Sequence, residues 1–232
     1  MEVNSLIKQN LRDVLENIET AKHNRPSNIT GDVLLVAVTK NHSVEQMQEA
    51  IDNGVTDIGE NRIQEALEKF SALDRNVTKH LIGHLQTNKV KQAVKHFDLI
   101  HSVDSQRLAQ AVDRAAQSLN KVQDVLVQIN LAREESKSGV DPDQLDELLS
   151  TVKDCTNLKL KGLMLIAPNY EQVEQCRPLF RQMYRLFQRQ KEIYPTVEYL
   201  SMGMTHDYKI AVEEGANLVR IGTAIFGARD YR

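Results

Sequence analysis

A lysine follows one of the most apolar short stretches of the chain. Residues 33–40 read VLLVAVTK, so that Lys40 comes two residues after a run of valine, leucine and alanine. An apolar run of this length is typical of a strand buried on both faces. At the end of such a strand an ammonium group is partly desolvated, which lowers its pKa and makes the free amine a nucleophile toward aldehydes. The alternative is a lysine that only ends the strand and extends into water.

Strands and helices alternate along the whole chain. The pattern predicts a helix over residues 3–23, followed by strands that end near residues 40, 61, 84, 102, 130, 167, 201 and 223. Helical stretches follow the first seven strands, over residues 43–53, 62–70, 86–95, 105–119, 141–153, 170–194 and 205–214. Strict alternation implies parallel strands joined by crossover helices. We therefore predict an α/β fold, a TIM (β/α)8 barrel with an extra N-terminal helix, formed by residues 1–232 as one domain.

A doubly wound open sheet is the alternative fold. No strand of this sequence is followed by the GxGxxG turn that is typical of dinucleotide-binding sheets. The barrel therefore remains the preferred prediction.

Composition and charge exclude several classes of protein. The 29 basic and 32 acidic residues give a net charge of −3, which argues against a nucleic-acid-binding surface. No apolar run is long enough for a membrane span, and the N-terminus lacks the apolar core of a signal peptide. Cys155 and Cys176 are the only cysteines, and they form no metal-binding pattern. We expect a cytoplasmic protein without nucleic-acid or membrane partners.

A second group of chemically useful residues lies near the carboxyl end of the chain. Residues 201–205 read SMGMT, and Gly222 and Thr223 follow the last predicted strand. Small residues with free N–H groups at helix starts bind anions, and barrels often bind phosphate after strands seven and eight. The alternatives are an N-capped helix and an ordinary strand end. A lysine and a phosphate site at one barrel mouth would suit pyridoxal 5′-phosphate (PLP) or a sugar phosphate.

The same residues lie in stretches that resemble the pyridoxal phosphate homeostasis protein family, whose fold is similar to the N-terminal barrel of alanine racemases. These stretches are VAVTK, IGENRIQE, HLIGHLQTNKVK, HSVDS, ESKSG, LSMGMTHDYKIAVEEGA and VRIGTAIFGARDY. The resemblance implies that Lys40 holds PLP as a Schiff base, that Asn61 lies beside the ring, and that Arg220 faces the pyridine nitrogen. It also implies five phosphate ligands, namely Ser201, Met202, Gly203, Gly222 and Thr223.

Arg220 bears on the chemistry that such a site would support. An arginine does not give up its proton in practice, so it would keep the pyridine nitrogen unprotonated and weaken the ring as an electron sink. Most PLP enzymes pair this nitrogen with a carboxylate. The apolar neighbours of Arg220 argue against a surface arginine.

Two functions fit the resemblance. The first is a monomeric PLP carrier without turnover, which buffers PLP or delivers it to PLP-dependent apo-enzymes. The second is an amino-acid racemase, which needs a base on each face of the substrate. In alanine racemases a tyrosine from an additional β domain supplies the second base. Because the sequence ends at Arg232, after the eighth unit, we expect no such domain and prefer the carrier.

Three further residues are predicted to lie near the barrel mouth. We expect His84 and His101 to be hydrogen-bonded structural histidines. Lys137, in the loop that reads ESKSG, is either a solvated lysine or a secondary acceptor, a second primary amine that takes the aldehyde from Lys40.

Overall fold

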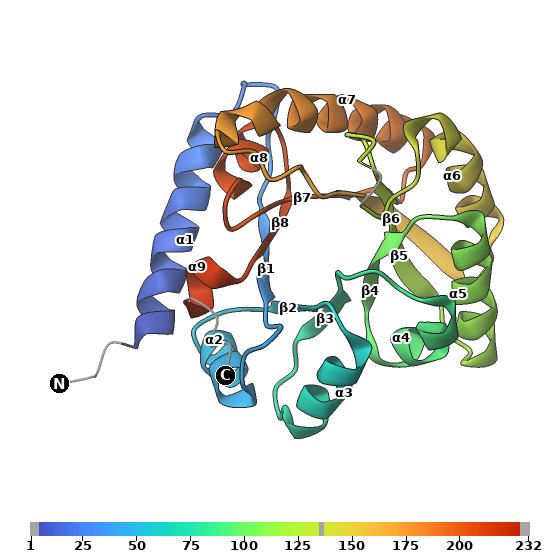
Figure 1. Ribbon diagram of the computed structural model, residues 1–232, viewed down its shortest axis with the longest axis horizontal. Coiled ribbons are helices and arrows are strands. Elements are labelled where there is room, and N and C mark those ends of the chain that lie inside the picture. Colours follow the sequence, from blue (N-terminus) through green and yellow to red (C-terminus); the bar gives the residue numbers. More distant parts are fainter. Residues whose placement is uncertain (1–4, 135–136, 228–232) are drawn as a thin grey trace.

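Eight parallel strands close into a barrel with helices around its outside (Figure 1). The computed structural model describes residues 5–134 and 137–227. The strands pair in chain order and are β1 (Leu34–Val38), β2 (Asp57–Glu60), β3 (Thr78–Leu81), β4 (Leu99–Val103), β5 (Gln123–Ile129), β6 (Leu158–Leu165), β7 (Tyr199–Met204) and β8 (Leu218–Ile221). Because β8 pairs with β1, the sheet has no free edge. The predicted TIM barrel is confirmed.

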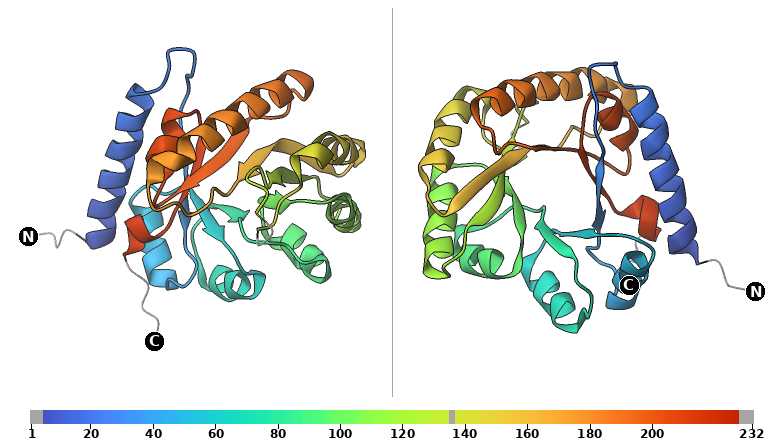
Figure 2. Two further views of the ribbon diagram at one scale, coloured as in Figure 1. Left: turned by 45° about the horizontal axis from the view of Figure 1, so that its top comes forward. Right: turned by 180° about the vertical axis from the view of Figure 1, so that it is seen from behind.

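Helices connect successive strands and surround the barrel (Figure 2). They are α1 (Leu6–His23), α2 (Val44–Asp52), α3 (Ile63–Ala72), α4 (Val90–His96), α5 (Gln106–Ser118), α6 (Leu145–Asp154), α7 (Arg177–Ile193), α8 (Tyr208–Glu213) and α9 (Thr223–Phe226). Short 3-10 turns precede α4, α6 and α7, namely η1 (Thr87–Lys89), η2 (Pro142–Gln144) and η3 (Val173–Cys176). The extra helix α1 lies on the flank of the barrel, where it packs against α8 and α9. None of the helices in the described ranges is both long and apolar enough to span a bilayer.

Local signals in the sequence set the ends of several helices. Ser43 caps α2 and forms a reciprocal capping box with Gln46, and Ser105 caps α5. Gly54 and Gly215 follow α2 and α8 with φ of +102°, a conformation that favours glycine at a helix end. The helices predicted over residues 43–53 and 105–119 are therefore confirmed.

Alternate residues of each strand face opposite sides of the barrel wall. On β5, Val125 and Val127 belong to the large apolar cluster that includes residues of the helices, whereas Leu126 packs with Leu99 and Met164 in a small separate cluster. Because strand side chains alternate, this small cluster fills one part of the barrel interior. Buried polar side chains of other strands, among them His80 and His101, support the site described below.

Several predicted boundaries were wrong. The strand predicted to end near residue 84 ends at Leu81, and the helix predicted over residues 170–194 begins only at Arg177. Further differences affect the site directly. The first strand ends at Val38 rather than Lys40. The seventh strand runs to Met204, so Ser201 lies inside it, and α8 begins only at Tyr208. At Gly203, where φ is +95°, a Cβ would lie 2.6 Å from the Ala211 Cβ. The end of β7 thus packs directly on α8, and a turn must separate the two elements.

Candidate functional site

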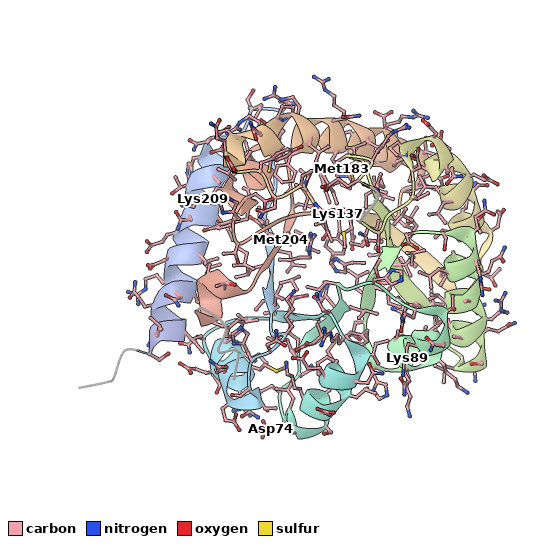
Figure 3. The ribbon with its side chains drawn as sticks, in the orientation of Figure 1. Asp74, Lys89, Lys137, Met183, Met204 and Lys209 are labelled. Atoms are coloured by element: carbon pink, nitrogen blue, oxygen red, sulfur yellow. The ribbon has the colours of Figure 1, made fainter. Side chains whose placement is uncertain are left out.

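A cavity of about 260 Å³ opens at the carboxyl ends of the strands, where barrel chemistry is expected. Five of the eight predicted site residues line it, namely Lys40, Asn61, Arg220, Gly222 and Thr223. Its other lining residues are Val38, His42, Ile82, Ile166, Met204, Thr205 and His206, which the prediction did not include. Met204 lies toward the middle of the ring of helices (Figure 3). The cavity therefore combines an amine, a guanidinium and hydroxyl groups with apolar walls.

The alternation of side chains continues past the end of β1 and directs Lys40 into the cavity. Val38 and Lys40 both line the cavity, whereas Thr39 between them is fully buried and contacts Glu60 and Lys69. Asn41 then turns the chain with φ of +61°, which asparagine tolerates better than most residues. Lys40 is therefore presented by a tight turn rather than by the strand itself.

A group of one hydroxyl and three charged side chains holds this turn from outside the barrel wall. We call Thr39, Glu60, Glu65 and Lys69 the ionic clamp. Thr39 Oγ1 donates to Glu60 Oε1 at 2.7 Å, and Lys69 Nζ donates to the same oxygen at 3.0 Å and to the Thr39 carbonyl at 2.8 Å. Glu65 Oε1 accepts from Lys69 Nζ and from the Asn41 N–H, both at 2.5 Å. The clamp thus fixes the backbone on both sides of Lys40.

Burial shapes the charges of the clamp. Glu60 is fully buried, and its Oε2 has no hydrogen-bond partner among the residues that the structure describes. Desolvation raises the pKa of Glu60, although Thr39 and Lys69 oppose this effect. Desolvation would also raise the pKa of Glu65, but its hydrogen bonds to Lys69 and Asn41 lower the value overall. The spacing of Glu65 and Lys69, one helical turn apart, is visible in the sequence, but their contact with the Lys40 turn is not.

Asn61 is placed by close packing of two strand ends. It follows β2 directly and lines the cavity. A Cβ at Gly83, which follows β3, would lie only 2.2 Å from the Asn61 carbonyl oxygen. Glycine at this position therefore allows the chain after β3 to approach and support Asn61.

Arg220 brings a buried cation to the cavity. It lies on β8 and is 3% exposed. Its Nη1 donates to Ser201 Oγ at 2.5 Å and its Nη2 donates to the Leu165 carbonyl at 3.0 Å. Desolvation lowers the pKa of Arg220 to about 10, against the opposing charge of Asp207. The guanidinium therefore stays protonated at neutral pH, as predicted.

The turns after β7 and β8 meet on one side of the cavity. The Gly222 N–H donates to Thr205 Oγ1 at 3.3 Å, and Thr223 is exposed at the start of α9. His42, which also lines the cavity, stacks on the Phe226 ring with centroids 4.6 Å apart. Thr205 and Thr223 thus line the same cavity as Lys40, where the sequence predicts a phosphate site.

Ser201, Met202 and Gly203 do not line the cavity. The Ser201 hydroxyl is fully buried and contacts Arg220 and His101 instead. Met202 packs in the large apolar cluster, and Gly203 lies against α8. That these three residues contact a ligand remains a prediction. For the Ser201 hydroxyl the lining of the cavity does not support it.

The other polar residues predicted near the mouth have separate positions. His101 is buried and hydrogen-bonded. His84 is also hydrogen-bonded, with its Nδ1 3.3 Å from Ser138 Oγ, although its side chain is 55% exposed. Lys137 Nζ donates to the Ala167 carbonyl at 3.0 Å and forms an ion pair with Glu134 at 2.6 Å. It is not among the residues that line the cavity. Residues 135–136 of this loop lie outside the described residues.

Comparison with known proteins gives concordant results. Residues 9–230 match the family described as alanine racemase, N-terminal domain. The pyridoxal phosphate homeostasis protein of Aquifex aeolicus is 42% identical over 225 residues, which cover 96% of this chain and 98% of that protein. PipY of Synechococcus elongatus, solved with PLP bound, is 36% identical with a TM-score of 0.83, and the match covers 95% of this chain and 100% of PipY.

A likeness to a more distant structure concerns the fold alone. Alanine racemase of Clostridium difficile is 17% identical with a TM-score of 0.73, and the match covers 96% of this chain and 60% of the racemase.

Proposed function

The chain belongs to the pyridoxal phosphate homeostasis protein family, and from this premise we propose that it binds PLP at the barrel mouth and carries, buffers or delivers it. The observation that carries the proposal is the convergence of Lys40, Arg220 and Thr223 on one cavity of about 260 Å³. PipY, which has PLP bound, supports the same ligand. In this proposal residues 1–232 act as a single PLP-binding domain.

The donor set of the cavity fits PLP group by group. Lys40 offers a primary amine to the aldehyde, Arg220 offers N–H donors to the ring nitrogen, and Asn61 lies where it could contact the ring. Gly222 and Thr223 would hold the phosphate from the β8 side. When bound, PLP supplies an aldehyde that reacts reversibly with primary amines. Lys40 would therefore hold the cofactor covalently without consuming it.

Apolar side chains complete the lining of the cavity. Val38, Ile82, Ile166 and Met204 line it together with Lys40 and Arg220. Such walls suit the faces of an aromatic ring and exclude water from the attachment point. The arrangement supports a site that stores the cofactor.

A racemase is the second candidate function. His42 and His206 line the cavity with Lys40, so more than one group there could move a proton. Two observations favour the carrier. No tyrosine lines the cavity in the described part of the chain, and protonated Arg220 would leave the ring nitrogen a weak electron sink. Incubating the PLP-loaded protein with a panel of amino acids, and following their chirality, separates the two functions.

Absorbance spectroscopy tests the binding proposal. Added PLP should give wild-type protein a visible absorbance band, and borohydride should then fix the cofactor to Lys40. Lys40→Ala should lose both the band and the label while keeping its circular dichroism spectrum. Lys137→Ala is the matched control, because this lysine does not line the cavity. A wild-type protein that gains no band would contradict the proposal.

The setting of this activity is part of the proposal. We expect a monomer in the cytoplasm that passes PLP to PLP-dependent apo-enzymes. Cys155 and Cys176 are both unpaired, which supports a reducing compartment. Sedimentation equilibrium tests the monomer, and reactivation of an apo-enzyme by the loaded protein tests the transfer.

A further inference from the structure

A continuous chain of hydrogen-bonded polar side chains runs through the barrel interior and ends at Arg220. We call Asp57, His80, His101, Ser201 and Arg220 the histidine relay; they lie on β2, β3, β4, β7 and β8. His80 Nε2 is 2.8 Å from Asp57 Oδ1, and His80 Nδ1 is 2.9 Å from His101 Nε2. His101 Nδ1 is 3.1 Å from Ser201 Oγ, which accepts from Arg220. All five residues are 0–6% exposed.

The two ends of the relay determine the direction of its two terminal hydrogen bonds. Arg220 can only donate, so Ser201 Oγ accepts at that end. At the other end an ionised Asp57 can only accept, so His80 donates from Nε2. Burial would raise the pKa of Asp57, but hydrogen bonds from His80 and Thr56 lower it overall, which keeps the carboxylate ionised.

One arrangement of protons then satisfies all members. Ser201 donates its hydroxyl proton to His101 Nδ1, and His101 donates from Nε2 to His80 Nδ1. In this arrangement both imidazoles are neutral and carry their proton on Nε2. Burial lowers the pKa of His101 well below its usual value, which agrees with a neutral ring. A cationic His80 would reverse the two central bonds, and the Ser201 proton would lose its acceptor in the relay.

The relay matters because Arg220 is a buried cation without an ion-pair partner among the described residues. Ser201 Oγ accepts one N–H from Arg220 Nη1, and the Leu165 carbonyl accepts one from Arg220 Nη2. An arginine has five N–H donors, so others are left for the cavity that Arg220 lines. The Ser201 acceptor is in turn oriented by His101, and His101 by His80 and Asp57.

We propose that Asp57, His80 and His101 are positioning residues that orient Ser201 and thereby hold the Arg220 guanidinium toward the acceptor atom of a heteroaromatic ligand. The inference rests on the proposed binding of PLP, whose ring nitrogen is such an acceptor. It also gives Ser201 a role different from phosphate binding. The relay would thus determine which ring the cavity prefers.

Ligand preference tests the proposal. The two probes are PLP and an analogue in which a C–H group replaces the ring nitrogen, and the readout is the ratio of their dissociation constants. Wild type should prefer PLP by about tenfold or more, because a hydrogen bond from a charged donor is lost with the analogue. His101→Phe and Ser201→Ala should each reduce this preference to less than about threefold, with the loss confined to PLP.

Two matched variants separate this role from others. Ser102→Ala removes a buried hydroxyl that has no hydrogen-bond partner among the described residues, and it should keep the preference. Thr223→Ala should weaken both probes equally, because both carry a phosphate. If Ser201→Ala also weakens both probes equally, Ser201 is a phosphate ligand or only a structural residue, and the proposal is overturned. A wild type that binds both probes equally well overturns it too.

Nitrogen NMR of the ligand-free protein tests the relay without any cofactor. The imidazole nitrogen shifts of His80 and His101 should report two neutral rings protonated on Nε2. A cationic ring, or a proton on Nδ1 of either ring, would overturn the proposed direction. Failure of wild type to bind either probe would instead refute the PLP function. The two failures are therefore distinguishable, even if His101→Phe does not fold.

Discussion

The ionic clamp and the histidine relay support the same cavity from opposite sides of the barrel wall. The clamp lies between the wall and α3 and brings Lys69 Nζ within 3.0 Å of two carboxylates. The relay lies inside the barrel, where His80, His101 and Ser201 separate the charges of Asp57 and Arg220. The clamp holds the backbone around Lys40, whereas the relay holds a side chain.

Access to solvent explains the difference. In the clamp the side chains of Lys69 and Glu65 are 11% and 21% exposed, so water offsets part of the cost of desolvating ions. The relay is more deeply buried, and there neutral groups that are both donors and acceptors join two distant charges at lower cost. Breaking the clamp should therefore change stability and the placement of Lys40, and breaking the relay should change ligand preference.

Lys69→Met should have the largest effect on stability. The variant leaves the buried Glu60 without its cation and should lower the free energy of unfolding by about 3–5 kcal/mol in urea titrations at neutral pH. Lys91→Met, an exposed position on α4, is the control and should change it by less than about 0.5 kcal/mol. A loss below about 1 kcal/mol for Lys69→Met would show that the clamp is no stronger than a surface ion pair.

Acidification should reduce the loss of stability that Lys69→Met causes. The raised pKa of folded Glu60 means that its protonated form is favoured, so its contribution to stability is present at low pH and lost as pH rises through the folded value. Without Lys69 this pKa should rise further. The lowered pKa of Glu65 also makes the difference between the two proteins smaller at low pH. Ionised Glu65 stabilises wild type, and wild type loses this stabilisation below about pH 4. Urea titrations should show a smaller difference between the proteins at about pH 4 than at pH 7; an equal or larger one would contradict this account.

Thr39→Val should separate the clamp from the relay most clearly. The change removes one donor to Glu60 with little change in shape and should cost about 1–2 kcal/mol of stability. The rate at which PLP attaches to Lys40 should fall, while the preference for PLP over the analogue without a ring nitrogen stays as in wild type. Stopped-flow absorbance and the ratio of dissociation constants measure the two effects. A loss of ligand preference would mean that the two networks are not independent.

Lys137→Ala should have the smallest effect. The side chains of its ion pair with Glu134 are 28% and 35% exposed, so stability should change by less than about 0.5 kcal/mol. Peptide mass mapping after borohydride reduction should still find the label on Lys40. In Lys40→Ala, a label on Lys137 that rises with pH would support the prediction that Lys137 is a secondary acceptor, and its absence there would contradict it.

Repetition and residue type made the fold and part of the site predictable. Eight strand-like runs separated by helical periodicity fix the barrel, since parallel strands need crossover helices. Lys40 beyond an apolar strand and Arg220 within one stand out because charged residues are costly among apolar neighbours. Ser201 was harder to place, because the turn at Gly203 depends on how closely β7 packs on α8.

The sequence by itself determined the barrel, the lysine at its mouth and the family. Only the tertiary structure decided which buried polar residues meet. Asp57 and His80 are 23 residues apart in the chain, and His101 and Ser201 are 100 apart. Their contacts depend on the stagger of the strands and on which side of the wall each side chain faces. A shift of one residue in any strand would turn these side chains to the other face, so their pairing is a property of the closed barrel.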